Sequence, residues 1–163
     1  MNLDPGARLI VDRLRAHGHQ VLLAGGCVRD WLLGRQPQDW DLVTDAAPEQ
    51  VRALFPRTVA VGARFGITVV LQDGHPYEVA RFRTDGPYPD GRRPASVTPA
   101  DPRADAMRRD FTVNAMFMEP LTGQVLDFAG GRADLRQRLI RAVGDPERRF
   151  AEDHLRMLRA VRF

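Results

Sequence analysis

The chain has 163 residues, of which 44% are hydrophobic, and a formal net charge of +3 at pH 7. This length and composition suit one globular core and exclude a disordered chain, and the single cysteine excludes an internal disulfide and a cysteine-based zinc site. No apolar run approaches the length of a membrane span, and no basic segment precedes an apolar stretch at the N-terminus, so we expect a cytoplasmic protein.

The first expected element is an amphipathic helix. Asp4 and Pro5 form an N-cap followed by a first-turn proline, and Leu9, Ile10 and Leu14 recur at helical spacing until Gly18. We expect this helix to cover a sheet.

The next stretch reads as a strand, a glycine turn and the start of a helix. The apolar run Val21 to Ala24 stops at Gly25 and Gly26, and residues 28–33 have the pattern of one or two helical turns. This arrangement aims backbone N–H groups at a phosphate.

A second short strand is expected over residues 39–43. It carries Asp39 and Asp41 two residues apart, and strand side chains alternate with period 2, so both carboxylates are expected on one side. Two hard oxygen donors at this spacing can share one Mg²⁺ or bracket two. An Asp-x-Asp pair alone carries little information, because solvated carboxylates beside a tight turn give the same pattern.

A short helix over residues 48–54, closed by Pro56, precedes three apolar segments. These are expected strands over residues 58–61, 67–71 and 77–82, the last two joined through Asp73 and Gly74 as a hairpin. Glu78 opens the last of them. It is the best candidate for a third catalytic carboxylate, and a plain strand-edge glutamate is the alternative.

The periodic pattern disappears from Arg83 to Asp105. This segment is rich in proline and glycine, so we expect a long mobile loop. A loop of this length inside a compact domain is usually functional, and a surface insertion is the alternative.

The last third of the chain predicts mostly helix. We expect residues 108–115 to begin a helix that buries Phe111, Val113 and Met116, followed by a short strand at 126–127 and a helix starting at Asp134. One continuous helix is expected over residues 147–163, capped by Asp145. Residues 131–163 carry more arginines than acids, which makes this end the expected polyanion-binding face.

Four ordered segments together resemble a known family. Residues 25–34, GGCVRDWLLG, followed four residues later by Asp39-Trp40-Asp41, resemble the signature of polymerase-β-like nucleotidyltransferases. In particular, they resemble the family of class II tRNA nucleotidyltransferases (CCA-adding enzymes) and bacterial poly(A) polymerases. RRDFTVNA at 108–115, FAGGRADLRQRLIR at 128–141, and EDHLR at 152–156 followed by LRAVRF resemble further motifs of that family, in family order.

The resemblance implies an α/β nucleotidyltransferase head domain over residues 1–143, with a mixed sheet of about five strands and flanking helices. Residues 144–163 would begin a helical neck, apparently truncated, since the last helix ends without a stop signal. The implied reaction is template-independent transfer of CMP and AMP from CTP and ATP to the 3′ end of a tRNA, with release of pyrophosphate and with Mg²⁺ held by Asp39 and Asp41.

The resemblance also implies a set of site residues. Asp39, Asp41 and Glu78 would be catalytic, and the expected nucleotide-binding residues are Gly25, Gly26, Arg29, Arg108, Arg109, Asp110, Asn114, Asp153, Arg156, Arg159 and Arg162. For Arg29 the alternative is a salt bridge to Asp30 or Asp110.

The resemblance also implies that the EDHLR segment selects the incoming base, and its Asp153 and Arg156 give this role a physical rationale. On one helix Asp153 and Arg156 would share a face, so the carboxylate can accept from an exocyclic amine while the guanidinium donates to a ring nitrogen. Cytosine and adenine present that pattern, whereas uracil and guanine present a carbonyl beside an N–H. The alternative is an ordinary surface ion pair between the two side chains.

Several activities share these motifs. A CC-adding or A-adding half-enzyme and a poly(A) polymerase are alternatives within the family, and a non-catalytic nucleotide- or RNA-binding module is an alternative outside it. The presence of both Asp39 and Asp41 argues against the last. Family members that add only CC are expected to lack the segment 83–105, which is present here.

Overall fold

The computed structural model describes residues 3–59 and 65–163. Within them the helices are α1 (Pro5–Ala16), α2 (Gly26–Leu32), α3 (Pro48–Leu54), α4 (Pro102–Arg108), α5 (Gly131–Gln137), α6 (Pro146–Glu152) and α7 (Leu155–Arg162), with a 3-10 turn η2 (Thr112–Asn114). The strands are β1 (Val21–Ala24), β2 (Leu42–Thr44), β3 (Thr58–Val59), β4 (Ile67–Gln72), β5 (His75–Arg81), β6 (Arg83–Asp85), β7 (Val97–Pro99), β8 (Met116–Met118) and β9 (Val125–Asp127).

The main sheet is mixed and has the strand order β3-β4-β5-β2-β1-β8-β9. Its one parallel pairing within the described residues joins β2 to β5, and the other neighbours run antiparallel. The expected mixed sheet is confirmed, but among the described residues it contains 7 strands rather than about five. One of the additional strands, β8, lies in a segment that the sequence pattern assigned to a helix.

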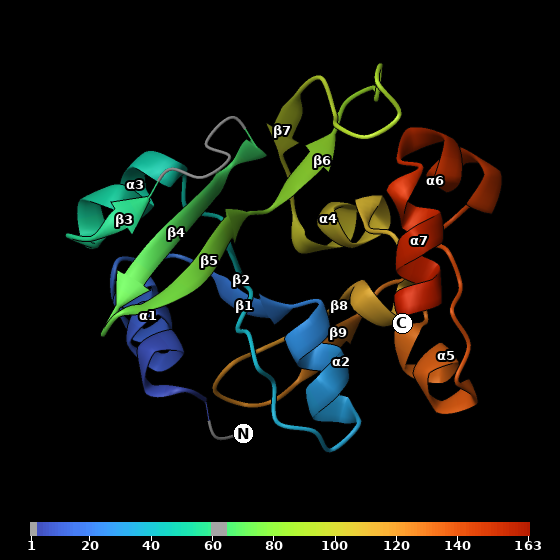
Figure 1. Cartoon of the computed structure of the whole chain (residues 1–163). Coiled ribbons are helices and arrows are strands. Elements are labelled where there is room, and N and C mark those ends of the chain that lie inside the picture. Colours follow the sequence, from blue (N-terminus) through green and yellow to red (C-terminus); the bar gives the residue numbers. More distant parts are fainter. Residues whose placement is uncertain (1–2, 60–64) are drawn as a thin grey trace.

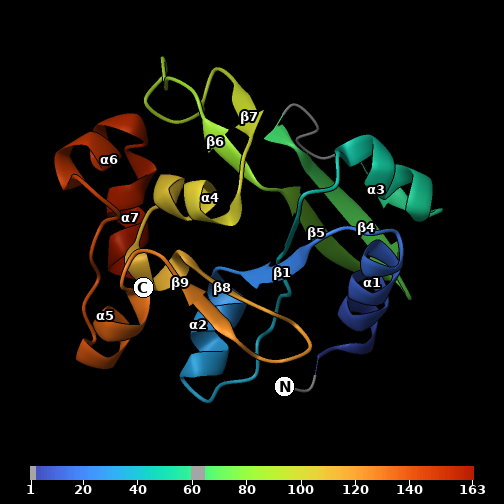
Figure 2. The same cartoon turned by 180° about the vertical axis from the view of Figure 1, so that it is seen from behind.

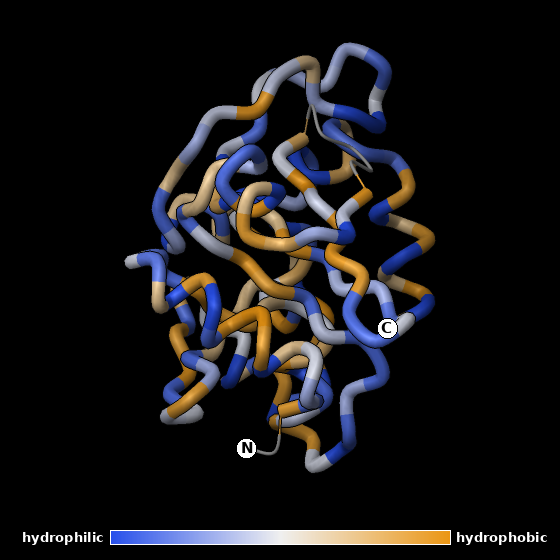
Figure 3. Tube along the Cα trace, turned by 90° about the vertical axis from the view of Figure 1, so that its left-hand side faces the viewer, coloured by the Kyte–Doolittle hydropathy of each residue, from blue (hydrophilic) through white to orange (hydrophobic). Residues whose placement is uncertain are grey.

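Both faces of the sheet are covered, as the alternation of side chains along β1 shows. Val21 and Leu23 pack in one hydrophobic cluster with α1, α2 and α3, while Leu22 and Ala24 pack in a second cluster with Ala106 of α4. The helices α1 and α3 lie toward one end of the molecule, and α6 and α7 lie at the other (Figure 1; Figure 2 from behind). Hydrophobic stretches run through the middle of the trace (Figure 3).

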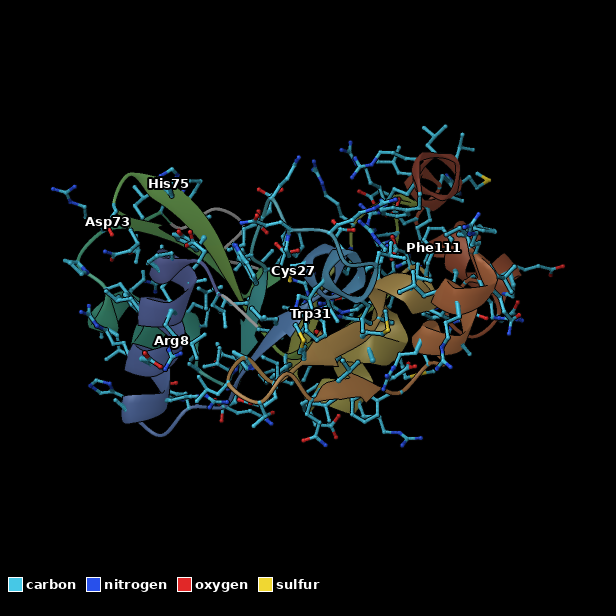
Figure 4. The ribbon with its side chains drawn as sticks, turned by 90° about the horizontal axis from the view of Figure 1, so that it is seen from below. Arg8, Cys27, Trp31, Asp73, His75 and Phe111 are labelled. Atoms are coloured by element: carbon cyan, nitrogen blue, oxygen red, sulfur yellow. The ribbon has the colours of Figure 1, made fainter. Side chains whose placement is uncertain are left out.

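The N-terminal helix and the β4–β5 hairpin form as expected. The Asp4 side chain accepts hydrogen bonds from the N–H groups of Gly6 and Ala7, which caps α1. Asp73 and Gly74 have φ of 51° and 83°, the left-handed pair that a tight two-residue hairpin requires. Figure 4 shows Asp73 and His75 at this turn, far from Cys27 and Trp31 on α2. The end of the expected strand 58–61 lies outside the described residues.

Three helix and strand predictions were wrong. The strand expected over residues 39–43 begins later, as β2, so Asp39 lies in a bend and Asp41 lies just before the strand. The Ala24 N–H nevertheless donates to the Asp41 carbonyl at 3.0 Å. The expected helix 108–115 is instead the end of α4, the 3-10 turn η2 and an approach to β8, although Phe111, Val113 and Met116 are buried as expected. The expected long final helix is two helices, α6 and α7, that meet at residues 153–154.

The segment 83–105 is also more ordered than its composition indicates. Arg83 to Asp85 pairs with Val97 to Pro99 as a two-stranded antiparallel sheet, and α4 begins at Pro102. Strands of three residues are too short for alternation to reveal them, which explains why this part was predicted as a loop. In the described part of the chain, no helix is both long and apolar enough to span a membrane.

Candidate functional site

A cleft of about 700 Å³ opens where α2, the start of β2, α4 and α7 come together. Every residue that the sequence predicted for the site lines it. They are Gly25, Gly26, Arg29, Asp39, Asp41, Glu78, Arg108, Arg109, Asp110, Asn114, Asp153, Arg156, Arg159 and Arg162. The fold therefore brings together residues that are up to 137 positions apart in the chain.

The glycine turn lets the backbone approach this cleft closely. Gly25 has φ of 70° and donates its N–H to the Met116 carbonyl at 3.3 Å, which ties the turn to β8. A Cβ atom on Gly25 would lie 3.4 Å from Arg109 Nη1 and 3.6 Å from Asp41 Oδ2. Glycine at this position thus keeps the space between a guanidinium and a carboxylate open.

The carboxylates lie along one side of the cleft. Asp39 and Glu78 are exposed, and Asp41 is half-buried. Burial raises the pKa of the Asp41 carboxyl, the negative charges of Glu78 and Asp39 add to the rise, and Arg109 opposes it. Asp39 and Glu78 are therefore close enough to Asp41 for their charges to act on it.

The donor set suits a hard divalent cation. Among the described residues no three acidic, histidine or cysteine side chains converge as a preformed metal cage. Asp39 and Asp41 nevertheless supply carboxylate oxygens beside an open cleft, and Mg²⁺ typically takes one or two carboxylates and completes its shell with water and substrate phosphate.

Arg29 and Asn114 form a hydrogen-bonded pair in the same cleft. Arg29 donates from Nε to Asp30 Oδ1 at 2.9 Å and from Nη1 to Asn114 Oδ1 at 2.8 Å, and its guanidinium lies 5.0 Å from the centre of the Phe163 ring. The salt bridge to Asp30 is therefore present, and it holds Arg29 at the cleft. Asp110 is bound from α7 by Arg159 Nε at 2.6 Å.

The break between α6 and α7 changes the geometry of the expected base-selecting pair. Asp153 ends α6, and its Oδ1 accepts from the Leu155 N–H at 3.0 Å. Arg156 is buried and donates from Nη1 to Glu152 Oε2 and to the Arg149 carbonyl, both at 2.9 Å. Between Asp153 and Arg156 the described side chains form no hydrogen bond or ion pair, so the surface ion pair considered as an alternative is absent.

Sequence reasoning missed several residues at the cleft. Asp85 and Tyr88 line it from the segment that was predicted as a loop, with the Tyr88 hydroxyl donating to Asp85 Oδ2 at 2.7 Å. Burial, with a contribution from Asp85, raises the pKa of Tyr88 to about 12. Two acids that bind the arginines were also missed: Asp105 is buried and Glu152 is half-buried. Asp105 lies three and four residues before Arg108 and Arg109, and Glu152 lies four residues before Arg156, and this helical spacing was a usable signal.

An α/β fold with a cleft in which arginines face carboxylates is typical of the class of proteins that bind anionic, phosphate-bearing ligands together with a cation. The comparison with family models narrows this class. The chain belongs to the poly(A) polymerase head domain family, whose model matches residues 21–141.

Relatives and solved structures agree with this assignment. The chain is 50% identical over 155 residues to the CCA-adding enzyme of Geobacillus stearothermophilus, covering 94% of this chain and 38% of that enzyme. The crystal structure of the Bacillus stearothermophilus CCA-adding enzyme in complex with CTP superposes with a TM-score of 0.87 at 45% identity, over 99% of this chain and 39% of that one. The Thermotoga maritima CCA-adding enzyme complexed with tRNA superposes with a TM-score of 0.73 at 28% identity, over 98% and 38% of the two chains.

These comparisons also set the extent of the likeness. The chain spans about two fifths of the length of the curated relatives it matches. The similarity to relatives and solved structures covers nearly all of this chain. The family match contains every residue that lines the cleft except Asp153, Arg156, Arg159, Arg162 and Phe163, which follow residue 141.

Proposed function

We propose that this chain is the catalytic head of a CCA-adding tRNA nucleotidyltransferase, which transfers CMP and AMP from CTP and ATP to the 3′ end of a tRNA. The observation that carries the proposal is the convergence of all fourteen predicted site residues on one cleft. The CTP and tRNA complexes of the similar enzymes support the choice of substrates.

The proposal assigns Asp39 and Asp41 as ligands for Mg²⁺. When bound there, the cation would supply Lewis-acid stabilisation of the phosphates and lower the pKa of the attacking hydroxyl. Burial and the neighbouring acids raise the pKa of the Asp41 carboxyl because they disfavour its charged form, and a cation held beside it would offset that effect. Glu78 is the third acid of the proposed catalytic set.

The arginines are assigned to the triphosphate. Gly25 and Gly26 leave room at the turn, and Arg29, Arg108 and Arg109 present guanidinium groups that are already held by protein acceptors. Such groups lose little freedom when they bind phosphate oxygens. Asp110 and Asn114 hold Arg159 and Arg29 in place, and Arg162 lies beside them at the rim.

Base choice is assigned to Asp153 and Arg156. Among the described groups, Asp153 Oδ2 accepts no hydrogen bond, so it is available to an exocyclic amine, while the N–H groups of Arg156 that do not bind protein can reach a ring acceptor. We propose the head as residues 1–143 and the start of the neck as 144–163. The burial of Val143 in the second hydrophobic cluster supports that boundary.

The test is addition to a tRNA that stops before its CCA end, with labelled CTP, ATP, UTP and GTP and with Mg²⁺. Two cytidines followed by one adenosine, and no reaction with UTP or GTP, are expected. Cytidine alone or adenosine alone would identify a half-enzyme, and a long adenosine tract would identify a poly(A) polymerase. Calorimetric titration with CTP, measured in parallel, separates a failure to hold tRNA from a failure to bind nucleotide, and absence of both would refute the proposal.

A further inference from the structure

Asp105 is a charged side chain with no solvent exposure that lies behind the cleft and does not line it. Its Oδ1 accepts from the backbone N–H of Arg83 at 3.1 Å and from Arg108 Nε at 2.9 Å. Its Oδ2 accepts from Arg109 Nε at 3.1 Å and Nη2 at 3.0 Å. One buried carboxylate therefore binds two successive arginines, each through a different oxygen.

The end of α4 makes this arrangement possible. Arg108 is the last residue of the helix, and Arg109 is its C-cap with extended backbone, φ −68° and ψ 167°. Asp105 lies one turn earlier, three and four residues before the arginines, so it faces both. The two side chains can then leave the same carboxylate in different directions.

The two guanidinium groups contact different residues of the cleft. Arg109 Nη1 donates to the Asn114 carbonyl at 3.3 Å, beside Gly25 and on the side of Asp41. Arg108 Nη1 lies 3.4 Å from Asp85 Oδ2, on the side of Tyr88. Asp105 thus connects the carboxylate end of the cleft with the end near α7.

Each arginine still has donors to spare. Arg109 uses Nε and one N–H of each terminal nitrogen on protein acceptors, which leaves two N–H groups for an anion. A guanidinium held along one edge presents its other edge in a fixed direction, which favours forked contacts with phosphate.

We propose that Asp105 is a positioning residue that orients Arg108 and Arg109 toward the triphosphate of the incoming nucleotide. The inference rests on the proposed function, because the triphosphate is the ligand that function supplies. Asp105 does not itself touch the substrate. Without it, the charge of the arginines would remain, but their directions would not be fixed.

The test compares two buried aspartates in the whole chain. Asp105→Asn keeps the side-chain shape and one acceptor oxygen but removes the charge and the second acceptor. Asp134→Asn is the matched control, because Asp134 is also buried and binds an arginine, Arg141, at 3.0 Å, but lies outside the cleft. Both are expected to lower the melting temperature, and only Asp105→Asn is expected to raise the Kd for CTP with Mg²⁺, by about tenfold.

A second variant keeps the proposal testable if Asp105→Asn does not fold. Arg109→Lys retains the positive charge, but a single ammonium cannot form the forked contact with Asp105 and present a second fixed edge, so a similar loss of CTP affinity is expected. Wild-type affinity in Arg109→Lys or in folded Asp105→Asn would overturn the proposal, as would an equal loss in Asp134→Asn. No CTP binding by the wild-type chain would instead refute the proposed function.

Discussion

Exchanging the two glycines of the central turn for alanine should have opposite effects. Gly25 has φ of 70° and ψ of −129°, a conformation that side chains with a Cβ atom rarely adopt. Forcing alanine into it costs about 1–3 kcal/mol. Gly26 is the first residue of α2, and a Cβ atom there would meet nothing closer than Arg29 Nη2 at 3.7 Å. Gly26→Ala should be neutral or gain up to about 1 kcal/mol through helix propensity.

The assay is thermal and urea unfolding followed by circular dichroism. For a chain of this size each kcal/mol shifts the melting temperature by roughly 2–4 °C, so Gly25→Ala should melt about 2–12 °C below wild type. It should also weaken CTP binding, because the new methyl group would enter the space between Arg109 and Asp41. Equal melting temperatures for the two variants, or a lower one for Gly26→Ala, would refute the role assigned to the backbone at Gly25.

Four further changes have defined expected outcomes. Asp41→Asn should reduce nucleotide transfer by roughly 100-fold or more, because it removes a proposed metal ligand. It should not lower the melting temperature, because it removes a charge that Glu78 repels. Retained transfer would exclude Asp41 as a metal ligand. Arg156→Ala should relax the exclusion of UTP in a competition assay, whereas wild-type selectivity would remove Arg156 from base choice. Gly131→Ala should destabilise the fold by about 1–3 kcal/mol in urea unfolding, since its Cβ would overlap the Thr112 carbonyl oxygen and lie 2.9 Å from Met116 Cγ. An unchanged midpoint of urea unfolding would contradict this packing. The hydrogen bond from Arg141 lowers the pKa of Asp134 below its ordinary 3.8, so this carboxylate stabilises the fold above that pH and less so as the pH falls. The difference in unfolding free energy between wild type and Asp134→Asn should therefore shrink below about pH 4.

Local signals in the sequence were sufficient where one residue type has one structural use. Asp4 with Pro5 marked the start of α1, and Asp73 with Gly74 marked the β4–β5 turn, because capping and left-handed φ values are properties of those residues themselves. The run Val21 to Ala24 was predicted correctly as a strand because it is short and ends at Gly25 and Gly26.

The segments that were mispredicted depend on contacts made elsewhere in the chain. β8 is fully buried beside β1, so its Met-Phe-Met sequence shows no alternation, and a buried strand of three residues cannot be distinguished from helix by pattern. β6 and β7 exist because they pair with each other across an eleven-residue connection, which no local pattern reveals.

The cleft shows that predicted residues can line one cleft although their local structure was predicted wrongly. The prediction placed Asp153 and Arg156 on one helix, because the apolar positions Phe150, Leu155 and Leu158 continue at helical spacing through the break. The spacing of apolar residues gives no information about the Asp153 carboxylate. This carboxylate accepts the Leu155 N–H at the point where α6 ends and α7 begins. The break turns Asp153 away from the side-chain pairing that a continuous helix would allow. Both groups therefore line the cleft unpaired with each other, and the proposed base selection requires a donor and an acceptor in that unpaired state.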